Sequence, residues 1–135
     1  MSDRYFKTGK HRGYMWCVRR TEAGTVCCYV NVSQNAALRD IWFRGADSEV
    51  DDIIQLHGGM TYFTKGVPHD GCVIWADDIV VGCDYGHYGD TLMSSQSPSV
   101  GMLDPTLWMT SSISEAAAES ETKGAIDALL LGTDV

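Results

Sequence analysis

Two runs of aromatic, β-branched and cysteine residues near the start of the chain constrain its fold more than any other feature. The first covers residues 14–20 and the second residues 25–31, with Glu22-Ala23-Gly24 between them. Aromatic and β-branched residues favour strands, and a short segment that contains glycine favours a turn between two antiparallel strands. The sequence therefore predicts a β-hairpin in this region.

Several further segments have the patterns of short strands or helices. Residues 36–43 are typical of a short helix, and residues 65–71 of a turn-rich loop. Strand-like patterns occur at residues 50–57, 60–64, 72–76 and 78–84, and the last of these is apolar enough to be a central strand.

A helix is expected at the C-terminal end of the chain. Ser112 and Glu115 match a capping box, in which the serine caps the first turn and the glutamate reaches back to it. The helix would continue to about residue 131, before Gly132. Its inner face would carry Ile113, Ala117, Gly124, Ala128 and Leu131. We therefore expect an α+β fold, with an antiparallel sheet of about five strands and a C-terminal helix packed on one face.

The domain organisation follows from length and from the polar start of the chain. A chain of 135 residues fits one domain. Residues 1–13 are polar and basic and are expected to form a mobile N-terminal segment, whereas residues 14–135 would form a single α+β domain. The sequence shows neither a signal peptide nor an apolar run long enough for a membrane span. These features favour a soluble protein of the cytoplasm, and the sequence does not indicate an oligomeric state.

Charge is distributed unevenly along the chain, which has a net charge of −8. Residues 1–44 contain eight basic and three acidic side chains, a net charge of +5, whereas residues 45–135 contain two basic and fifteen acidic ones, a net charge of −13. The two parts are expected to neutralise each other across the fold. The acidic excess disfavours general binding of nucleic acids and suits a basic protein partner, although the basic part could hold one phosphate.

The five cysteines are Cys17, Cys27, Cys28, Cys72 and Cys83. An odd number without a Cys-x-x-Cys pair argues against a disulfide framework and against a zinc ribbon. Reduced, buried thiols are therefore expected. The predicted hairpin would bring Cys17 close to Cys28.

Two segments contain the residues best suited to a binding or catalytic site: His57-Gly58-Gly59 and the segment from Gly82 to Asp90. In the second segment Asp84, His87 and Asp90 follow one another at three-residue steps, and the glycines between them permit sharp turns. If His57 joined them, two imidazoles and two carboxylates would suit Zn²⁺, Mn²⁺ or Fe²⁺ and an activated water.

Two other interpretations of the same segment stay open. The side chains could form a purely structural polar network beneath a loop. They could also bind a ligand without a metal, through His57, Tyr85, His87 and Tyr88. The sequence does not decide whether the protein is an enzyme.

At these residues the chain resembles a family of uncharacterised small proteins of bacteriophages and prophages. The matching pieces are Cys28-Tyr29-Val30, His57-Gly58-Gly59-Met60-Thr61-Tyr62 and Gly82-Cys83-Asp84-Tyr85-Gly86-His87-Tyr88-Gly89-Asp90, in the same order as in the family. They represent the motifs His-Gly-Gly-x-Thr-Tyr and Gly-x-Asp-x-x-His-x-Gly-Asp, and the resemblance extends over residues 14–130. Cys83 stands where the family has phenylalanine and Tyr85 where it has cysteine, so no family thiol is carried over.

The resemblance implies a shared set of His57, Asp84, His87 and Asp90 but no established activity. It also implies expression from a mobile genetic element inside a bacterial cell. The main hypothesis is therefore a small accessory protein of a phage or prophage that acts by binding a host defence protein or its nucleotide signal. The alternative is a metal-dependent hydrolase that uses the His/Asp set.

Overall fold

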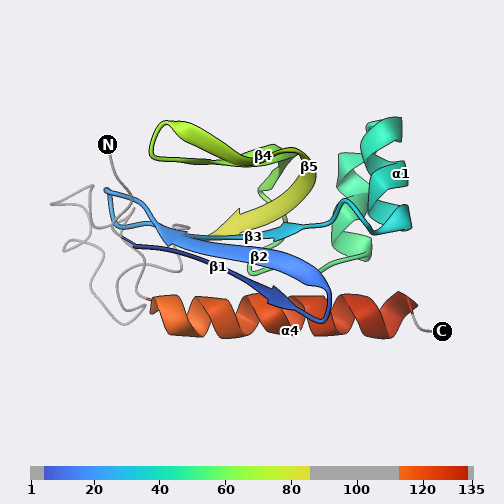
Figure 1. Cartoon of the computed structure of the whole chain (residues 1–135). Coiled ribbons are helices and arrows are strands. Elements are labelled where there is room, and N and C mark those ends of the chain that lie inside the picture. The colour runs from blue at the N-terminus through green and yellow to red at the C-terminus, as the bar shows by residue number, and fades with distance from the viewer. Residues whose placement is uncertain (1–4, 86–112, 134–135) are drawn as a thin grey trace, which may run out of the picture.

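A five-stranded antiparallel sheet forms the centre of the computed structural model, which describes residues 5–85 and 113–133. The strands are β1 (Tyr5–His11), β2 (Tyr14–Arg20), β3 (Val26–Asn31), β4 (Tyr62–His69) and β5 (Cys72–Asp84), in the spatial order β1-β2-β3-β5-β4. The helices are α1 (Ala36–Arg44), the 3₁₀ helix η1 (Asp47–Asp52) and α4 (Glu115–Thr133). Helix α4 runs along one face of the sheet (Figure 1), which confirms the expected α+β architecture.

The predicted hairpin and the short helix after it are both confirmed. Strands β2 and β3 pair in antiparallel register, with Val18 opposite Cys28. Helix α1 begins after Asn35, whose side-chain oxygen accepts a hydrogen bond from the Leu38 N–H at 3.0 Å. It ends at Gly45, which has a φ of 68° and supplies the left-handed conformation that closes many helices.

The expectation of a mobile segment over residues 1–13 is wrong for strand β1, which forms an edge of the sheet. It pairs with β2 along its whole length, from Tyr5 opposite Arg20 to His11 opposite Tyr14. Gly9 permits this close approach, because a Cβ atom there would lie 2.4 Å from the Trp16 ring. The polar side chains are compatible with a strand because carboxylates of α4 pair with two of them, Lys7 and His11. Residues 1–4 lie outside the described part of the chain.

Residues 50–57 do not form the strand that their pattern suggested. Part of this segment belongs to η1, and the rest is an irregular connection to β4. Val50 and Ile54 are both fully buried. A half-buried strand would bury residue 52 on the same face, but Asp52 is exposed, so the burial of residues 50 and 54 without residue 52 suits a helical turn.

Strands β4 and β5 are longer than expected. Strand β4 continues through most of the segment predicted as a loop, with an irregularity between Lys65 and Val67 where Gly66 has a φ of 80°. The two predicted strands at 72–76 and 78–84 are one strand, β5, which contains Trp75 with a φ of 54°. The reversal of direction is confined to Asp70 and Gly71.

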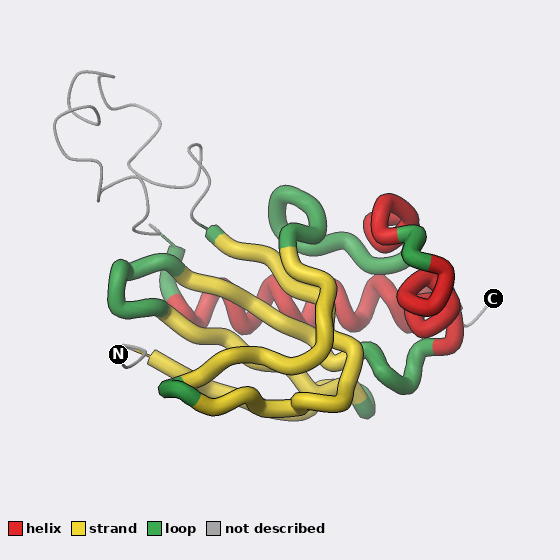
Figure 2. The backbone as a smooth tube through the Cα atoms, turned by 90° about the horizontal axis from the view of Figure 1, so that it is seen from above, coloured by secondary structure: helices red, strands yellow, loops and turns green. Residues whose placement is uncertain are grey.

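The sheet has two apolar faces. We call the face under α4 the helix face; it includes Val18, Cys28, Cys83 and Tyr85. The other is the hairpin face, because the far end of the β4–β5 hairpin folds over it (Figures 1 and 2). The stacking of Phe6 in β1 on His69 in β4, with ring centroids 3.6 Å apart, shows this folding, since these two strands lie at opposite edges of the sheet. The hairpin face is built around Cys17, Cys27, Tyr29, Val67 and Val80.

The predicted inner face of the C-terminal helix is wrong. The buried residues of α4 are Ala118, Thr122, Ala125, Ile126 and Leu129, whereas Ala117, Gly124, Ala128 and Leu131 are exposed. The predicted stripe was counted from Ile113, which precedes the helix and therefore does not share its periodicity. The Oγ of Ser114 accepts a hydrogen bond from the Ala117 N–H at 3.0 Å, as an N-cap does. The predicted cap, Ser112, lies outside the described residues.

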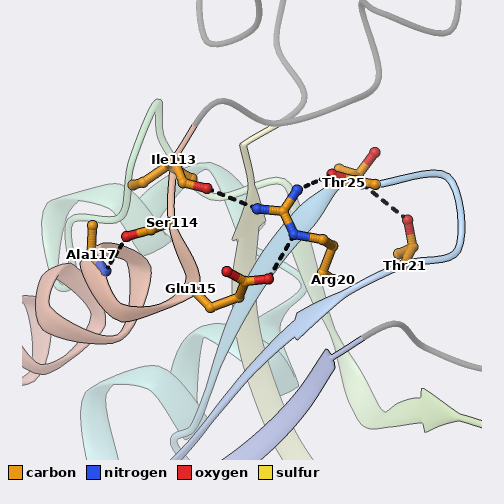
Figure 3. A network of polar contacts seen from close by, with 8 residues as sticks. Arg20, Thr21, Thr25, Ile113, Ser114, Glu115 and Ala117 are labelled. Carbon is orange, nitrogen blue, oxygen red and sulfur yellow. Dashed lines mark hydrogen bonds and ion pairs between the residues drawn. The ribbon is translucent and has the colours of Figure 1, made fainter.

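Arg20 joins the start of α4 to the β2–β3 hairpin (Figure 3). Its Nε donates to Glu115 at 2.7 Å, and its two terminal nitrogens donate to the carbonyl oxygens of Gly24 at 2.7 Å and Ile113 at 2.9 Å. Arg20 is only 14% exposed, so these bonds are largely shielded from water. They fix where the helix begins relative to the sheet. In the two described ranges, no helix combines the length and the hydropathy needed to cross a membrane.

Candidate functional site

Three polar side chains from distant parts of the chain meet beside the end of β5. The rings of His57 and Tyr85 are stacked, with centroids 4.4 Å apart and 24° between their planes. The Tyr85 hydroxyl donates to Glu121 Oε1 at 3.0 Å, and His57 Nδ1 lies 3.7 Å from the same oxygen. We call these three residues the His–Tyr–Glu cluster.

Each member of the cluster is positioned by a different element. Tyr85 follows β5, and its N–H donates to the Val26 carbonyl at 2.8 Å, so the sheet fixes its backbone. His57 precedes Gly58 and Gly59, which have φ values of 69° and 91° and allow the chain to reverse before β4. Glu121 lies in α4, next to buried Thr122. Tyr85 is buried, whereas 31% of the His57 side chain and 53% of the Glu121 side chain are exposed, so the cluster presents polar groups to the surface.

Two buried thiols lie directly beneath Tyr85. Cys28 in β3 and Cys83 in β5 are opposite each other, with 3.0 Å between their sulfur atoms. The hydrogen bond from Cys83, together with the neighbouring hydroxyls of Thr122 and Tyr85, lowers the pKa of Cys28 below the ordinary thiol value. The same contact with Cys28, together with burial, raises the pKa of Cys83.

The expected approach of Cys17 to Cys28 is wrong. Cys17 is opposite Tyr29 on the hairpin face, whereas Cys28 is on the helix face. All five cysteines are in the reduced form in this structure. The sequence identified neither the Cys28–Cys83 pair nor the role of Glu121, because both depend on which strands and helices pack together.

The predicted metal ligands are only partly described, and those that are do not converge. Asp84 is opposite Cys27, so it projects on the hairpin face, and the Thr61 hydroxyl donates to its carboxylate at 3.5 Å. His57 lies with Tyr85 on the helix face. Adjacent residues of a strand point to opposite sides of the sheet, which separates Asp84 from His57. Within residues 5–85 and 113–133, no three His, Cys, Asp or Glu side chains are grouped so that they could hold a metal ion.

The remaining predicted site residues, His87, Tyr88 and Asp90, lie outside the described part of the chain. Of the predicted ligand-binding set, the structure therefore brings His57 and Tyr85 together.

Ion pairs between the N-terminal strands and α4 neutralise part of the basic charge. Lys7 lies 3.0 Å from Glu119. His11 and Arg12 lie 2.8 Å and 3.2 Å from the same oxygen of Asp127. With the Arg20–Glu115 pair, these contacts have the arrangement that the uneven charge distribution predicted: the acidic C-terminal helix balances the basic strands.

A different group of carboxylates remains at the surface around η1. Asp47, Asp51 and Asp52 are exposed. Asp51 Oδ1 accepts a hydrogen bond from the Met60 N–H at 2.8 Å, which ties η1 to the loop after His57. A shallow depression beside this bond is lined by Asp51, Gln55, Leu56 and Gly59. We call η1 and this depression the acidic surface; it adjoins His57 through Leu56.

Comparison with known proteins gives no match to a family model, a curated protein or a solved structure.

Proposed function

We propose that this chain is a small binding protein that contacts a basic surface of a partner protein. The observation that carries the proposal is the division of the charges. The carboxylates of α4 pair with Lys7, His11, Arg12 and Arg20. In η1, by contrast, Glu49 pairs with Arg44, and three aspartates are exposed: Asp47, Asp51 and Asp52. An exposed group of like charges attracts a surface of opposite charge and accelerates association with it.

The proposed contact surface combines the acidic surface with the exposed parts of His57 and Glu121. His57 follows Leu56 of the acidic surface in the sequence, and its imidazole lies 3.7 Å from the Glu121 carboxylate. The imidazole and carboxylate supply directional hydrogen bonds, whereas η1 supplies negative charge. Such a combination favours specific recognition over general electrostatic attraction.

A protein partner fits this charge distribution better than a nucleotide does. Phosphate groups need cationic donors. Lys7, Arg12 and Arg20 are already engaged by carboxylates of α4. We further propose the setting that the resemblance implies: an accessory protein of a phage or prophage that binds a host defence protein. The hydrolase alternative gains no support from the described residues, because Asp84 faces away from His57.

To test this, the full chain is immobilised and the bacterial host proteins that it retains are measured. The double variant Asp47→Asn/Asp52→Asn is compared with the unaltered protein. Asparagine keeps the shape of aspartate and removes its charge. The matched control is Glu22→Gln/Asp70→Asn, which removes the same charge from the two hairpin turns, away from α1 (Figure 1).

We expect one or more host proteins to be retained at low salt and released as salt is raised. The η1 variant should weaken retention by about tenfold, since the charges of an interface act mainly on the rate of association. The control should retain the same proteins as the unaltered chain. Absence of any retained protein, or equal loss with both variants, would contradict the proposal.

A further inference from the structure

The Cys28–Cys83 pair occupies a position in the sheet at which a disulfide fits. The Tyr85 N–H donates to the Val26 carbonyl, and the Val32 N–H donates to the Ile79 carbonyl, each at 2.8 Å. Because antiparallel pairs alternate along a ladder, Cys28 and Cys83 also belong to a hydrogen-bonded pair. Opposite Cα atoms in such pairs lie about 5.5 Å apart, which is within the Cα range that disulfides span. The Cβ atoms of such a pair are farther apart than those of a non-hydrogen-bonded pair, so the two strands have to draw slightly together as the bond forms.

The two sulfur atoms are already in contact, at 3.0 Å. Both side chains project from neighbouring strands onto the helix face, so no strand has to move across the sheet for a bond to form. We propose that Cys28 and Cys83 form a reversible disulfide when a small peroxide oxidises the protein.

The size of the oxidant follows from burial. Cys28 is 1% exposed and Cys83 is 2% exposed, so a bulky disulfide reagent cannot approach either sulfur while the fold is closed. Hydrogen peroxide is comparable in size to water.

The reaction balances with hydrogen peroxide as the only co-reactant. The Cys28 thiol releases its proton and the thiolate attacks one peroxide oxygen. The O–O bond breaks, and the leaving hydroxide takes up that proton, so a sulfenic acid and one water form. The Cys83 sulfur then attacks the Cys28 sulfur, the S–O bond breaks, and a second water leaves as the S–S bond forms. Two thiols are oxidised and one peroxide is reduced to two waters.

Groups around Cys28 make it the more reactive of the two thiols. The contact with the Cys83 sulfur, at 3.0 Å, lowers the pKa of Cys28 and raises the pKa of Cys83, so a negative charge is favoured on Cys28. The Cys83 sulfur lies within reach to resolve the sulfenic acid, so the intermediate does not have to diffuse or wait for an external thiol.

The other cysteines are poorly placed to compete. Cys27 is next to Cys28 in the sequence but belongs to the hairpin face, as does Cys17. Cys72 is exposed at the beginning of β5, at the other end of that strand from Cys83. The structure therefore assigns the disulfide to one pair, independently of the proposed binding function.

The experiment treats the reduced full chain with hydrogen peroxide, denatures it in the presence of iodoacetamide and maps cysteine linkage by mass spectrometry. We expect neither Cys28 nor Cys83 to be alkylated, a peptide linkage that fragmentation assigns to these two residues, and recovery of both thiols with dithiothreitol. Oxidation of the exposed Cys72 shows that the peroxide treatment was effective. If Cys28 and Cys83 were both still alkylated after such a treatment, the proposal would be overturned. A linkage through Cys17, Cys27 or Cys72 would also overturn it.

Neighbouring residues provide matched variants. Cys27→Ala and Cys28→Ala each remove one buried thiol from the same strand, on opposite faces. The first should keep the linkage and the second should lose it. A linkage that survives Cys28→Ala would refute the assignment. Mapping on the unaltered chain decides the question even if either variant fails to fold.

Discussion

The ring of Tyr85 lies against the imidazole of His57, with centroids 4.4 Å apart, while its hydroxyl donates to Glu121 at 3.0 Å. One buried side chain therefore connects the loop before β4 to helix α4. It also belongs to the same buried core cluster as Cys28 on the helix face. The stability of this corner depends on Tyr85 both as a packed ring and as a hydrogen-bond donor.

Replacement of Tyr85 can separate these two contributions. Tyr85→Phe keeps the ring and removes the hydroxyl, so the free energy of unfolding should fall by about 1 kcal/mol. Tyr85→Ala also leaves a cavity beneath the loop and should cost about 3–5 kcal/mol. Urea unfolding of the two variants provides the comparison. Equal losses would mean that the ring contributes nothing beyond its hydroxyl, contrary to the burial of Tyr85.

Arg20 should contribute more to stability than an arginine in an exposed ion pair. Arg20→Met removes all its donors to Glu115, Gly24 and Ile113, and should lower the free energy of unfolding by about 2 kcal/mol, because the bonds are mostly buried. Arg44→Met is the control, since Arg44 forms two exposed ion pairs and should matter little.

Thermal unfolding and hydrogen exchange in the first turn of α4 would measure this difference. Exchange there should accelerate in the Arg20 variant and not in the Arg44 variant. Similar behaviour of the two variants would show that Arg20 does not hold the start of the helix.

Two glycines should respond to alanine in opposite ways. A Cβ atom at Gly82 would lie 2.6 Å from the Cys28 carbonyl oxygen and 2.7 Å from the Tyr29 ring, so Gly82→Ala should destabilise the sheet by about 1–3 kcal/mol. At Gly124, in the middle of α4, the added carbon would meet no atom within 4 Å in the described residues, apart from its chain neighbours and the helix's own backbone. Gly124→Ala should therefore stabilise the protein by about 0.5–1 kcal/mol.

Denaturant titration of both variants tests the orientation of α4 as well as the packing of β5. If Gly124 belonged to the inner face, as the helix periodicity counted from Ile113 suggested, alanine there would instead disturb the core. A loss of stability in Gly124→Ala would favour that orientation over the one in the structure.

Local patterns predicted those elements whose conformation depends mainly on neighbouring residues. The hairpin at β2 and β3 has strand-forming residues on both sides of a short turn, and α1 has a cap at Asn35. Strand β1 was missed because its polar residues become compatible with a sheet only when α4 supplies Glu119 and Asp127. That pairing joins residues more than one hundred positions apart.

The candidate site shows the same division between local and tertiary information. His57 and Tyr85 stood out because glycine turns and the end of an apolar strand lie beside them. Asp84 was grouped with His57, although the alternation of a strand that ends at Asp84 already places it on the other face from Tyr85. No sequence pattern around Glu121 indicates its contact with Tyr85, because only the packing of α4 on the sheet brings the two residues together.

The pairing of α4 with the N-terminal strands should make stability depend on acid. Hydrogen bonds from Lys123 and Lys7 hold the pKa of Glu119 below its ordinary value of 4.5. His11 and Arg12 likewise hold the pKa of Asp127 below its ordinary value of 3.8. A carboxyl group with a lower pKa in the folded state binds protons more weakly there than in the unfolded chain. Its stabilising contribution is therefore complete above the ordinary value and disappears as the pH falls through the lowered one.

Urea midpoints measured between pH 7 and pH 3 should accordingly fall below about pH 4.5. In Glu119→Gln the fall should be shallower, because that residue no longer takes up a proton on unfolding. Glu22→Gln removes an exposed carboxylate from the β2–β3 turn and should leave the acid dependence as it is. Added salt should also reduce the fall, since these ion pairs are near the surface. An acid loss in Glu119→Gln that is as steep as in the unaltered chain, or steeper, would show that α4 is not held to β1 by this carboxylate.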